Sequence, residues 1–208
     1  MEQKVYEMYQ KWVSEPSLDT LTRKQLADIE NNEDIIFDSF YKELEFGTAG
    51  LRGIIGVGSN RMNVYTVRRA TQGLANYLKK HYENSKVAIA YDSRNFSKVF
   101  AYEAANVLSS NNIEAYVFDS LQATPVLSYA VRYLSCQAGI NITASHNPAE
   151  YNGYKVYGDD GCQITLKGAA AVLEKINELD VFNDIKISSF DNGLANGSIS
   201  YIGEDIIN

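Results

Sequence analysis

The residues with the clearest chemical potential lie in the stretch ITASHNPAEYNGYKVYG, residues 142–158, where an apolar run ends in Ser145, His146, Asn147 and Pro148. A serine hydroxyl is a weak nucleophile at neutral pH. It needs either a neighbouring base or a strongly electrophilic partner, such as a phosphoryl group held by cations. Two kinds of chemistry are therefore open to this serine, hydrolysis through a base and phosphoryl transfer.

A serine hydrolase would need a histidine base within hydrogen-bond reach of the hydroxyl. The chain has two histidines, His81 in the charged stretch KKHYENSK and His146 directly after the serine. Neighbouring side chains on an extended chain point to opposite sides, and the ASHNP context lacks the flanking glycines of a GxSxG elbow. These features disfavour a Ser-His-Asp enzyme.

Phosphoryl transfer needs an exposed hydroxyl on a loop, positive groups that neutralise phosphate oxygens, and main-chain donors made available by turns. The pair Asn147–Pro148 predicts a turn, and Asn152–Gly153 permits another. His146 and Lys155 could supply charge or a proton, and Arg52 stands in a glycine-rich segment elsewhere. Capping of a turn is the simpler role for a lone serine.

The elements that would position this serine follow from an alternation of helical and strand-like patterns. Because short crossovers of this kind build a mostly parallel sheet flanked by helices, we expect an α/β fold whose ligands gather at the carboxyl ends of the strands. The segments DSR at 92–94 and DS at 119–120 and the residue Ser145 each follow a predicted strand. The DSR segment could touch a ligand or form a solvated turn, and we assign it no catalytic role. The predicted helices are 64–81, 97–110 and 124–134, and the predicted strands are 86–91, 113–118 and 137–143.

The remaining chain predicts further elements on both sides of this alternation. Residues 1–45 carry apolar residues at helical spacing and predict a helical amino-terminal extension, with one helix over Asp34–Leu44. We expect the α/β domain to span 46–190, with a strand over 153–157 and a helix over 166–179 that Thr165 caps. Residues 191–208 are rich in Gly and Asn-Gly turns and predict a linker towards a second domain.

Composition excludes several classes of protein. The 208 residues are 45% hydrophobic and 22% charged, as in an ordinary globular protein, and the net charge of −7 comes without a Lys/Arg block for nucleic acid. We find no secretory signal and no run near the roughly 18 apolar residues of a membrane span, so we expect a cytoplasmic protein without membrane contact.

Cys136 and Cys162 are too few and too far apart for a disulfide framework or a CxxC metal site. The glycines of 47–58 do not form a GxGxxG or Walker motif.

Two longer motifs carry a resemblance to a known family. TASHNP followed by NGYKVYG resembles the active-site serine loop of the alpha-D-phosphohexomutases, the phosphoglucomutase and phosphomannomutase family. LEFGTAGLRGIIGVGSNRMN, residues 44–63, is similar to the amino-terminal motif of that family. The form FGTAGLRG with a helical extension is similar to the phosphoglucomutase and phosphopentomutase branch. The resemblance covers essentially the whole chain and implies the first domain of the family, with its mostly parallel mixed sheet.

The resemblance also implies an activity and a set of site residues. Ser145 would hold the transferable phosphate, with His146, Lys155 and Arg52 as catalytic residues beside it. Thr48, Arg52, Ser145 and His146 would bind the substrate. Family members move phosphate between the 1- and 6-positions of a hexose through a phosphoserine and a bisphosphorylated sugar, with glucose 1,6-bisphosphate as activator. The choice of general acid or base between Lys155 and His146 stays open.

The sequence also departs from the full family pattern. The DGDGDR metal loop is absent, as are the later sugar and phosphate loops, so we expect Mg²⁺ to bind mainly through missing domains of the same chain, with a phosphate oxygen on Ser145 contributing. The 208-residue chain alone would then show negligible mutase turnover. A phosphomannomutase, a phosphopentomutase acting on a pentose phosphate, and a noncatalytic sugar-phosphate binding module remain the alternatives.

Overall fold

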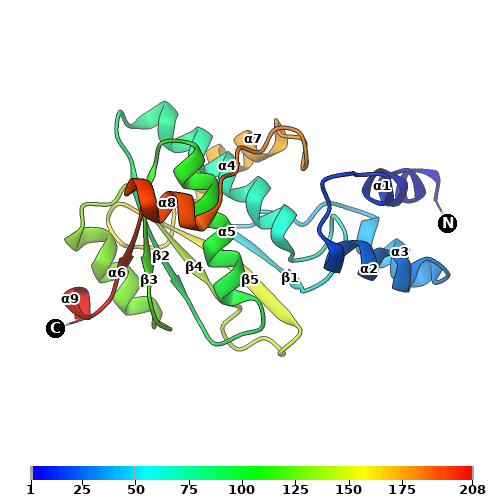
Figure 1. The fold of residues 1–208 in the computed structure, drawn as a ribbon, viewed down its shortest axis with the longest axis horizontal. Helices are drawn as coiled ribbons and strands as arrows, with labels where there is room; N and C mark the ends of the chain where they lie inside the picture. The colour runs from blue at the N-terminus through cyan, green and yellow to red at the C-terminus, as the bar shows by residue number, and fades with distance from the viewer. Residues whose placement is uncertain (1, 49, 208) are drawn as a thin grey trace.

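A mixed β-sheet between layers of helices forms the centre of the computed structural model, which describes residues 2–48 and 50–207 (Figure 1). Within those residues the sheet has six strands in the order β1-β5-β4-β2-β3-β6. The strands are β1 (Gly50–Ile54), β2 (Lys86–Tyr91), β3 (Glu114–Phe118), β4 (Ala138–Ile142), β5 (Tyr151–Gly158) and β6 (Ile199–Ile202). The helices are α1 (Gln3–Val13), α2 (Thr20–Ile29), α3 (Glu33–Phe40), α4 (Val64–His81), α5 (Ser97–Ser110), α6 (Thr124–Tyr133), α7 (Leu166–Asn177), α8 (Phe190–Asn196) and α9 (Glu204–Ile207).

The direction of the strands confirms the expected mostly parallel mixed sheet. Strands β4, β2, β3 and β6 are parallel to one another, whereas β5 runs antiparallel to both β4 and β1. The alternation of predicted helices and strands from α4 to β4 is confirmed as well, with the ends of some elements moved by one residue. The carboxyl ends of the parallel strands therefore meet at one edge of the sheet, where the polar segments follow them.

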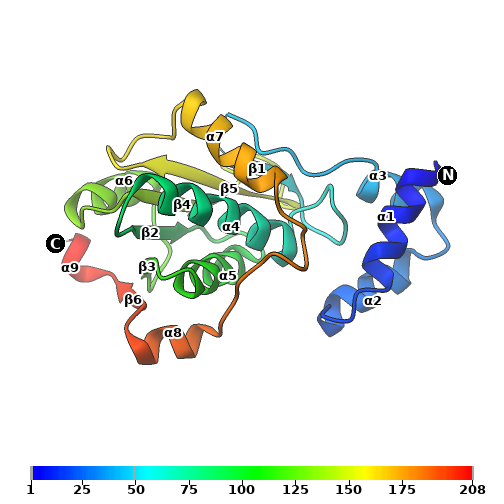
Figure 2. The ribbon, with the colours of Figure 1, turned by 90° about the horizontal axis from the view of Figure 1, so that it is seen from above.

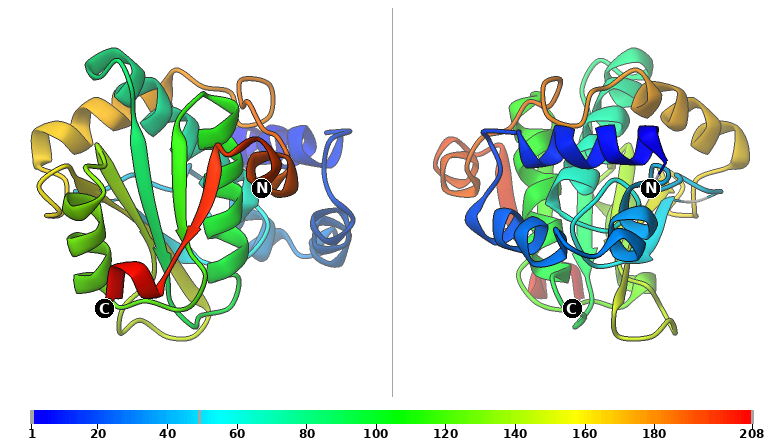
Figure 3. Two further views of the ribbon diagram at one scale, coloured as in Figure 1. Left: turned by 60° about the vertical axis from the view of Figure 1, so that its left-hand side comes forward. Right: turned by 90° about the vertical axis from the view of Figure 1, so that its right-hand side faces the viewer.

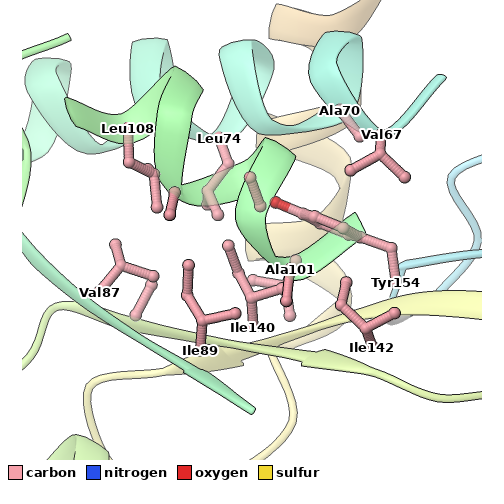
Figure 4. Close-up of a cluster of buried hydrophobic side chains, with 14 of the residues drawn as sticks. Val67, Ala70, Leu74, Val87, Ile89, Ala101, Leu108, Ile140, Ile142 and Tyr154 are labelled. Carbon is pink, nitrogen blue, oxygen red and sulfur yellow. The ribbon is translucent and has the colours of Figure 1, made fainter. Parts of the chain in front are cut away.

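Helices cover both faces of the sheet and bury its apolar side chains. Helices α4, α5 and α7 pack on one face and α6 and α9 on the other (Figure 2, seen from above). In β4, Ile140 and Ile142 point towards α4 and α5, where Leu74 and Leu108 close the core (Figure 4). Because side chains alternate along a strand, residues between these positions, such as Asn141, face α6. No helix in the described part of the chain combines the length and apolar character that a membrane span needs.

The first three helices form a small cluster of their own at one end of the molecule (Figures 2 and 3). The indole of Trp12 is fully buried and meets the rings of Phe40, Tyr65 and Phe182 edge to face at 5.1 to 5.8 Å. The predicted helix 34–44 ends earlier, at the last residue of α3, because the chain turns back and Leu44 N–H binds another loop. These contacts attach the predicted extension to α4 and to the segment after α7.

The segment 191–208 differs from the linker that its glycines predict. Its described part holds most of α8 and all of β6 and α9, while Asn208, like Met1 at the other end of the chain, lies outside the described residues. Ile199 and Ile202 are buried, and β6 pairs in parallel with β3 at the edge of the sheet. Local composition could not reveal this strand, because it is held by its pairing with distant residues. A second domain beyond it stays a prediction.

The aromatic cluster predicts a stability effect. We expect Trp12→Ala to lower the free energy of unfolding by about 3–5 kcal/mol, because it leaves a cavity among three rings. Val13→Ala, a matched change at a neighbouring residue that is 42% exposed, should change it by less than about 0.5 kcal/mol. Urea unfolding followed by circular dichroism measures both, and equal losses would contradict the assigned packing.

Candidate active site

Ser145 lies on the loop that joins β4 to β5, at the carboxyl end of β4, and we call residues 143–150 the serine loop. The side chain is exposed, and the main chain adopts a left-handed conformation with φ of 56°. Such a conformation costs a non-glycine residue about 1–3 kcal/mol and persists where the surroundings hold it. Its N–H donates to Thr143 Oγ1 at 3.0 Å, and Asn147 N–H donates to Ala144 O at 3.1 Å. The predicted turn at Asn147 is therefore present.

The turn that Asn152–Gly153 would permit is absent, because both residues lie inside strand β5, which confirms the predicted strand over 153–157 and begins two residues before it. Gly153 does not form a turn but lets the neighbouring main chains approach it closely. A Cβ on Gly153 would lie 2.6 Å from Thr143 O and 3.0 Å from Leu51 O, so only a glycine lets the three strands meet there. Asn152 is fully buried and its amide donates to Asn95 O and Ser97 Oγ. These bonds fix the start of β5 to the loop between β2 and α5.

The two predicted cationic residues lie on the same face of the sheet, on strands β1 and β5. Gly50 is paired with Lys155 and Arg52 with Gly153, so the side chains of Arg52 and Lys155 are diagonal neighbours. The guanidinium of Arg52 is exposed and reaches the serine loop, where it donates to Asn147 Oδ1 at 3.0 Å. Arg52 and Asn147, which are 95 positions apart in the chain, thus meet in the loop that carries Ser145.

The surroundings of Lys155 change its acidity. Partial burial lowers the pKa of its ammonium group, and the positive charge of Arg52 lowers it further, while the carboxylate of Asp92 opposes the shift. A lowered pKa means that a larger fraction of this lysine is neutral at a given pH than of an ordinary lysine. This direction suits a group that takes up and releases a proton.

The two remaining predicted site residues, His146 and Thr48, are exposed. His146 follows the serine on the exposed turn, with Nδ1 3.5 Å from Ser145 Oγ, which is too long for a strong hydrogen bond. Thr48 is exposed in the turn before β1, and its neighbour Ala49 lies outside the described residues. The roles of His146 and Thr48 in substrate binding stay predictions.

Arg94 and Asp92, which received no role from the sequence, hold the serine loop and the start of α5. The guanidinium of Arg94 donates to main-chain carbonyls of the loop, and Asp92 accepts from Ser97 Oγ at 2.7 Å. The only feature of the sequence that pointed to these two residues was their position directly after a predicted strand. The segments 92–94 and 119–120 line one open hollow at the carboxyl ends of β2 and β3, and Ser145 is not among the residues that line it.

The site does not by itself provide a magnesium centre. Among residues 2–48 and 50–207, no group of three or more His, Cys, Asp or Glu side chains is placed to hold a metal ion. The carboxylate of Asp92 is engaged with Arg94 and Ser97. Mg²⁺ prefers an octahedral set of oxygen ligands, so the ion would need ligands beyond these residues.

Comparisons with known proteins agree with this fold. The family described as phosphoglucomutase/phosphomannomutase, alpha/beta/alpha domain I, matches residues 43–181. A phosphoglucomutase of Staphylococcus saprophyticus is 42% identical over 78% of this chain, and one of Staphylococcus haemolyticus is 49% identical over 67%. A solved structure of a candidate phosphomannomutase from Thermus thermophilus superposes with a TM-score of 0.63 at 26% identity, over 71% of this chain and 32% of that one.

The fold is therefore the α/β/α first domain of a sugar-phosphate mutase family. The chain belongs to the phosphoglucomutase/phosphomannomutase family, the alpha-D-phosphohexomutases. The match spans 30% of the length of the Staphylococcus saprophyticus relative and 26% of the Staphylococcus haemolyticus relative.

The charge arrangement around Lys155 predicts a titration result. Removing the neighbouring cation with Arg52→Gln should raise the pKa of Lys155 towards the ordinary lysine value, because one of the two causes that lower it is lost. Carbon-13 NMR of the lysine Cε against pH measures the change. Arg132→Gln, which removes a cation from α6, is the control and should leave the titration unchanged. An unchanged pKa in Arg52→Gln would contradict the assigned contact.

Proposed function

We propose that this chain is the catalytic-serine domain of a phosphoglucomutase-type enzyme, in which Ser145 accepts and returns a phosphoryl group. The observation that carries the proposal is the exposed Ser145 on a loop that Arg52 reaches, with Lys155, a lysine of lowered pKa, as the diagonal neighbour of Arg52 on the sheet. A hydroxyl in this setting has cations for the phosphate oxygens and a nearby proton carrier. The names of the relatives favour glucose phosphate as the sugar, with mannose and pentose phosphates as alternatives.

In the proposed step, Ser145 Oγ attacks a phosphorus of glucose 1,6-bisphosphate. The new Oγ–P bond forms while the bond between that phosphorus and the sugar oxygen breaks. The hydroxyl proton passes to Lys155 or His146, and the departing sugar oxygen takes up a proton and leaves as a hydroxyl on glucose monophosphate. The reverse step returns the phosphoryl group to either position of the sugar, which moves phosphate between them. Positioning and neutralisation of charge would supply most of the catalysis.

A complete reaction cycle needs more of the cleft than the described residues provide. The relatives are more than three times as long as their matched segments, and the described residues provide no complete magnesium site. We therefore place the sugar contacts and most of the Mg²⁺ ligands in other domains of the same enzyme, with a phosphate oxygen on Ser145 as one ligand. A cytoplasmic location remains a prediction.

Phosphate exchange tests the nucleophile directly. Incubation of the 208-residue chain with glucose 1,6-bisphosphate and Mg²⁺ should add one phosphate to Ser145, detected by intact mass and phosphopeptide mapping. Ser145→Ala should abolish the addition, while Ser93→Ala, a matched change at another exposed serine of this edge, should not. Incorporation in the Ser145→Ala variant would exclude the assigned nucleophile, and a wild-type chain that stays unmodified would favour the noncatalytic binding module.

Turnover of the chain alone is a separate test. We expect negligible conversion of glucose 1-phosphate to glucose 6-phosphate by the 208-residue chain, because the second half of the cycle needs the intermediate to be held in a closed cleft. A coupled assay for glucose 6-phosphate measures this, with a full-length family enzyme as positive control. Robust conversion by the chain would show that other domains are not needed.

A further inference from the structure

The side chain of Arg94, in the loop between β2 and α5, binds the main chain of the serine loop and the first residue of β5. Its Nη2 donates to Ser145 O at 2.6 Å and to Asn147 O at 2.7 Å. Its Nη1 donates to Pro148 O at 2.9 Å and to Tyr151 O at 3.1 Å. One guanidinium therefore holds four carbonyl groups of the connection between β4 and β5.

The terminal N–H donors of this guanidinium are all used. An arginine side chain has five N–H donors and no acceptor. The four donors on the two terminal nitrogens take the four carbonyls, and Nε faces Asp92 Oδ2 at 3.5 Å. No terminal donor of Arg94 is left for a phosphate. In contrast, the guanidinium of the exposed Arg52 makes one hydrogen bond, to the side chain of Asn147.

The loop that carries Arg94 is itself held in place. Asp92 Oδ1 accepts from the main-chain N–H of Arg94 at 3.0 Å and from Ser97 Oγ at 2.7 Å. Ser97 is fully buried at the start of α5 and accepts from the amide of Asn152 at 2.9 Å. The side chain of Arg94 is 14% exposed. Strand β2, helix α5 and strand β5 thus fix the position from which the guanidinium acts.

We propose that Arg94 is the positioning residue of the phosphoryl-transfer site. It holds Ser145 in its left-handed conformation through the serine's own carbonyl, so that the hydroxyl stays presented outwards. This inference rests on the proposed role of Ser145 as the phosphate carrier. Lysine cannot replace Arg94, because an ammonium group has three donors and no planar fork.

The test combines kinetics with a structural measurement on the 208-residue chain. We compare wild type, Arg94→Lys and Arg94→Ala, with Arg132→Lys on α6 as the matched control, since that guanidinium makes a single long contact to Ser128 O at 3.4 Å. The rate of Ser145 phosphorylation by saturating glucose 1,6-bisphosphate should fall by about 100-fold in both Arg94 variants, as expected for a misplaced nucleophile. The half-saturating concentration should stay nearly unchanged. Methylguanidinium should partly restore the rate of Arg94→Ala.

Amide hydrogen exchange of residues 144–152 measures how firmly the loop is held and does not depend on phosphoryl transfer. Exchange there should become faster in both Arg94 variants and stay unchanged in the core strands β2 and β4. A wild-type rate and protected loop in Arg94→Lys would overturn the inference. A raised half-saturating concentration at a wild-type rate would also overturn it, because Arg94 would then bind substrate. If the wild-type chain takes up no phosphate, the proposed function fails, and the exchange measurement alone decides whether Arg94 positions the loop.

Discussion

The geometry of the candidate site depends on one set of hydrogen bonds, between the guanidinium of Arg94 and four carbonyls of the β4–β5 connection. A loop that carries a left-handed serine would relax to other conformations in the absence of such contacts, because the strained residue costs about 1–3 kcal/mol. A guanidinium suits this task since it presents its donors in a rigid plane. The cation also leaves positive charge next to the main chain of Ser145.

The sheet explains why the site lies where it does. Parallel strands end at a common edge, and the loops after β2, β3 and β4 meet there. The antiparallel strand β5 returns from that edge and pairs with β1, so that Lys155 lies diagonal to Arg52, which reaches the serine loop. Gly153 permits this arrangement because a side chain there would collide with two carbonyl oxygens. Core packing of α4 and α5 against β2 and β4 keeps these strands in register.

Two kinds of arginine therefore serve one loop. Arg52 is exposed, contacts a side chain and keeps donors available for an anion. Arg94 is mostly buried, and its terminal donors are all bound to main-chain carbonyls. Lys155 differs from both arginines because its charge can change. Burial and the charge of Arg52 lower its pKa, while the charge of Asp92 limits the shift. In the proposed function, Arg94 would hold the serine and Arg52 would meet its phosphate, so positioning and phosphate contact would fall to different arginines.

The sequence by itself determined the helices and strands from α4 to α7, the exposed turn at Ser145 and the family, because these depend on local periodicity, turn residues and contiguous motifs. Only the tertiary structure decided that Asn152 lies in a strand, that residues 199–202 complete the sheet, and that Arg94 binds the serine loop. Each of these depends on contacts between segments that are far apart in the chain. Local patterns report which conformation a segment prefers, whereas the partner of a buried amide, a strand edge or a guanidinium is set by how the whole chain packs.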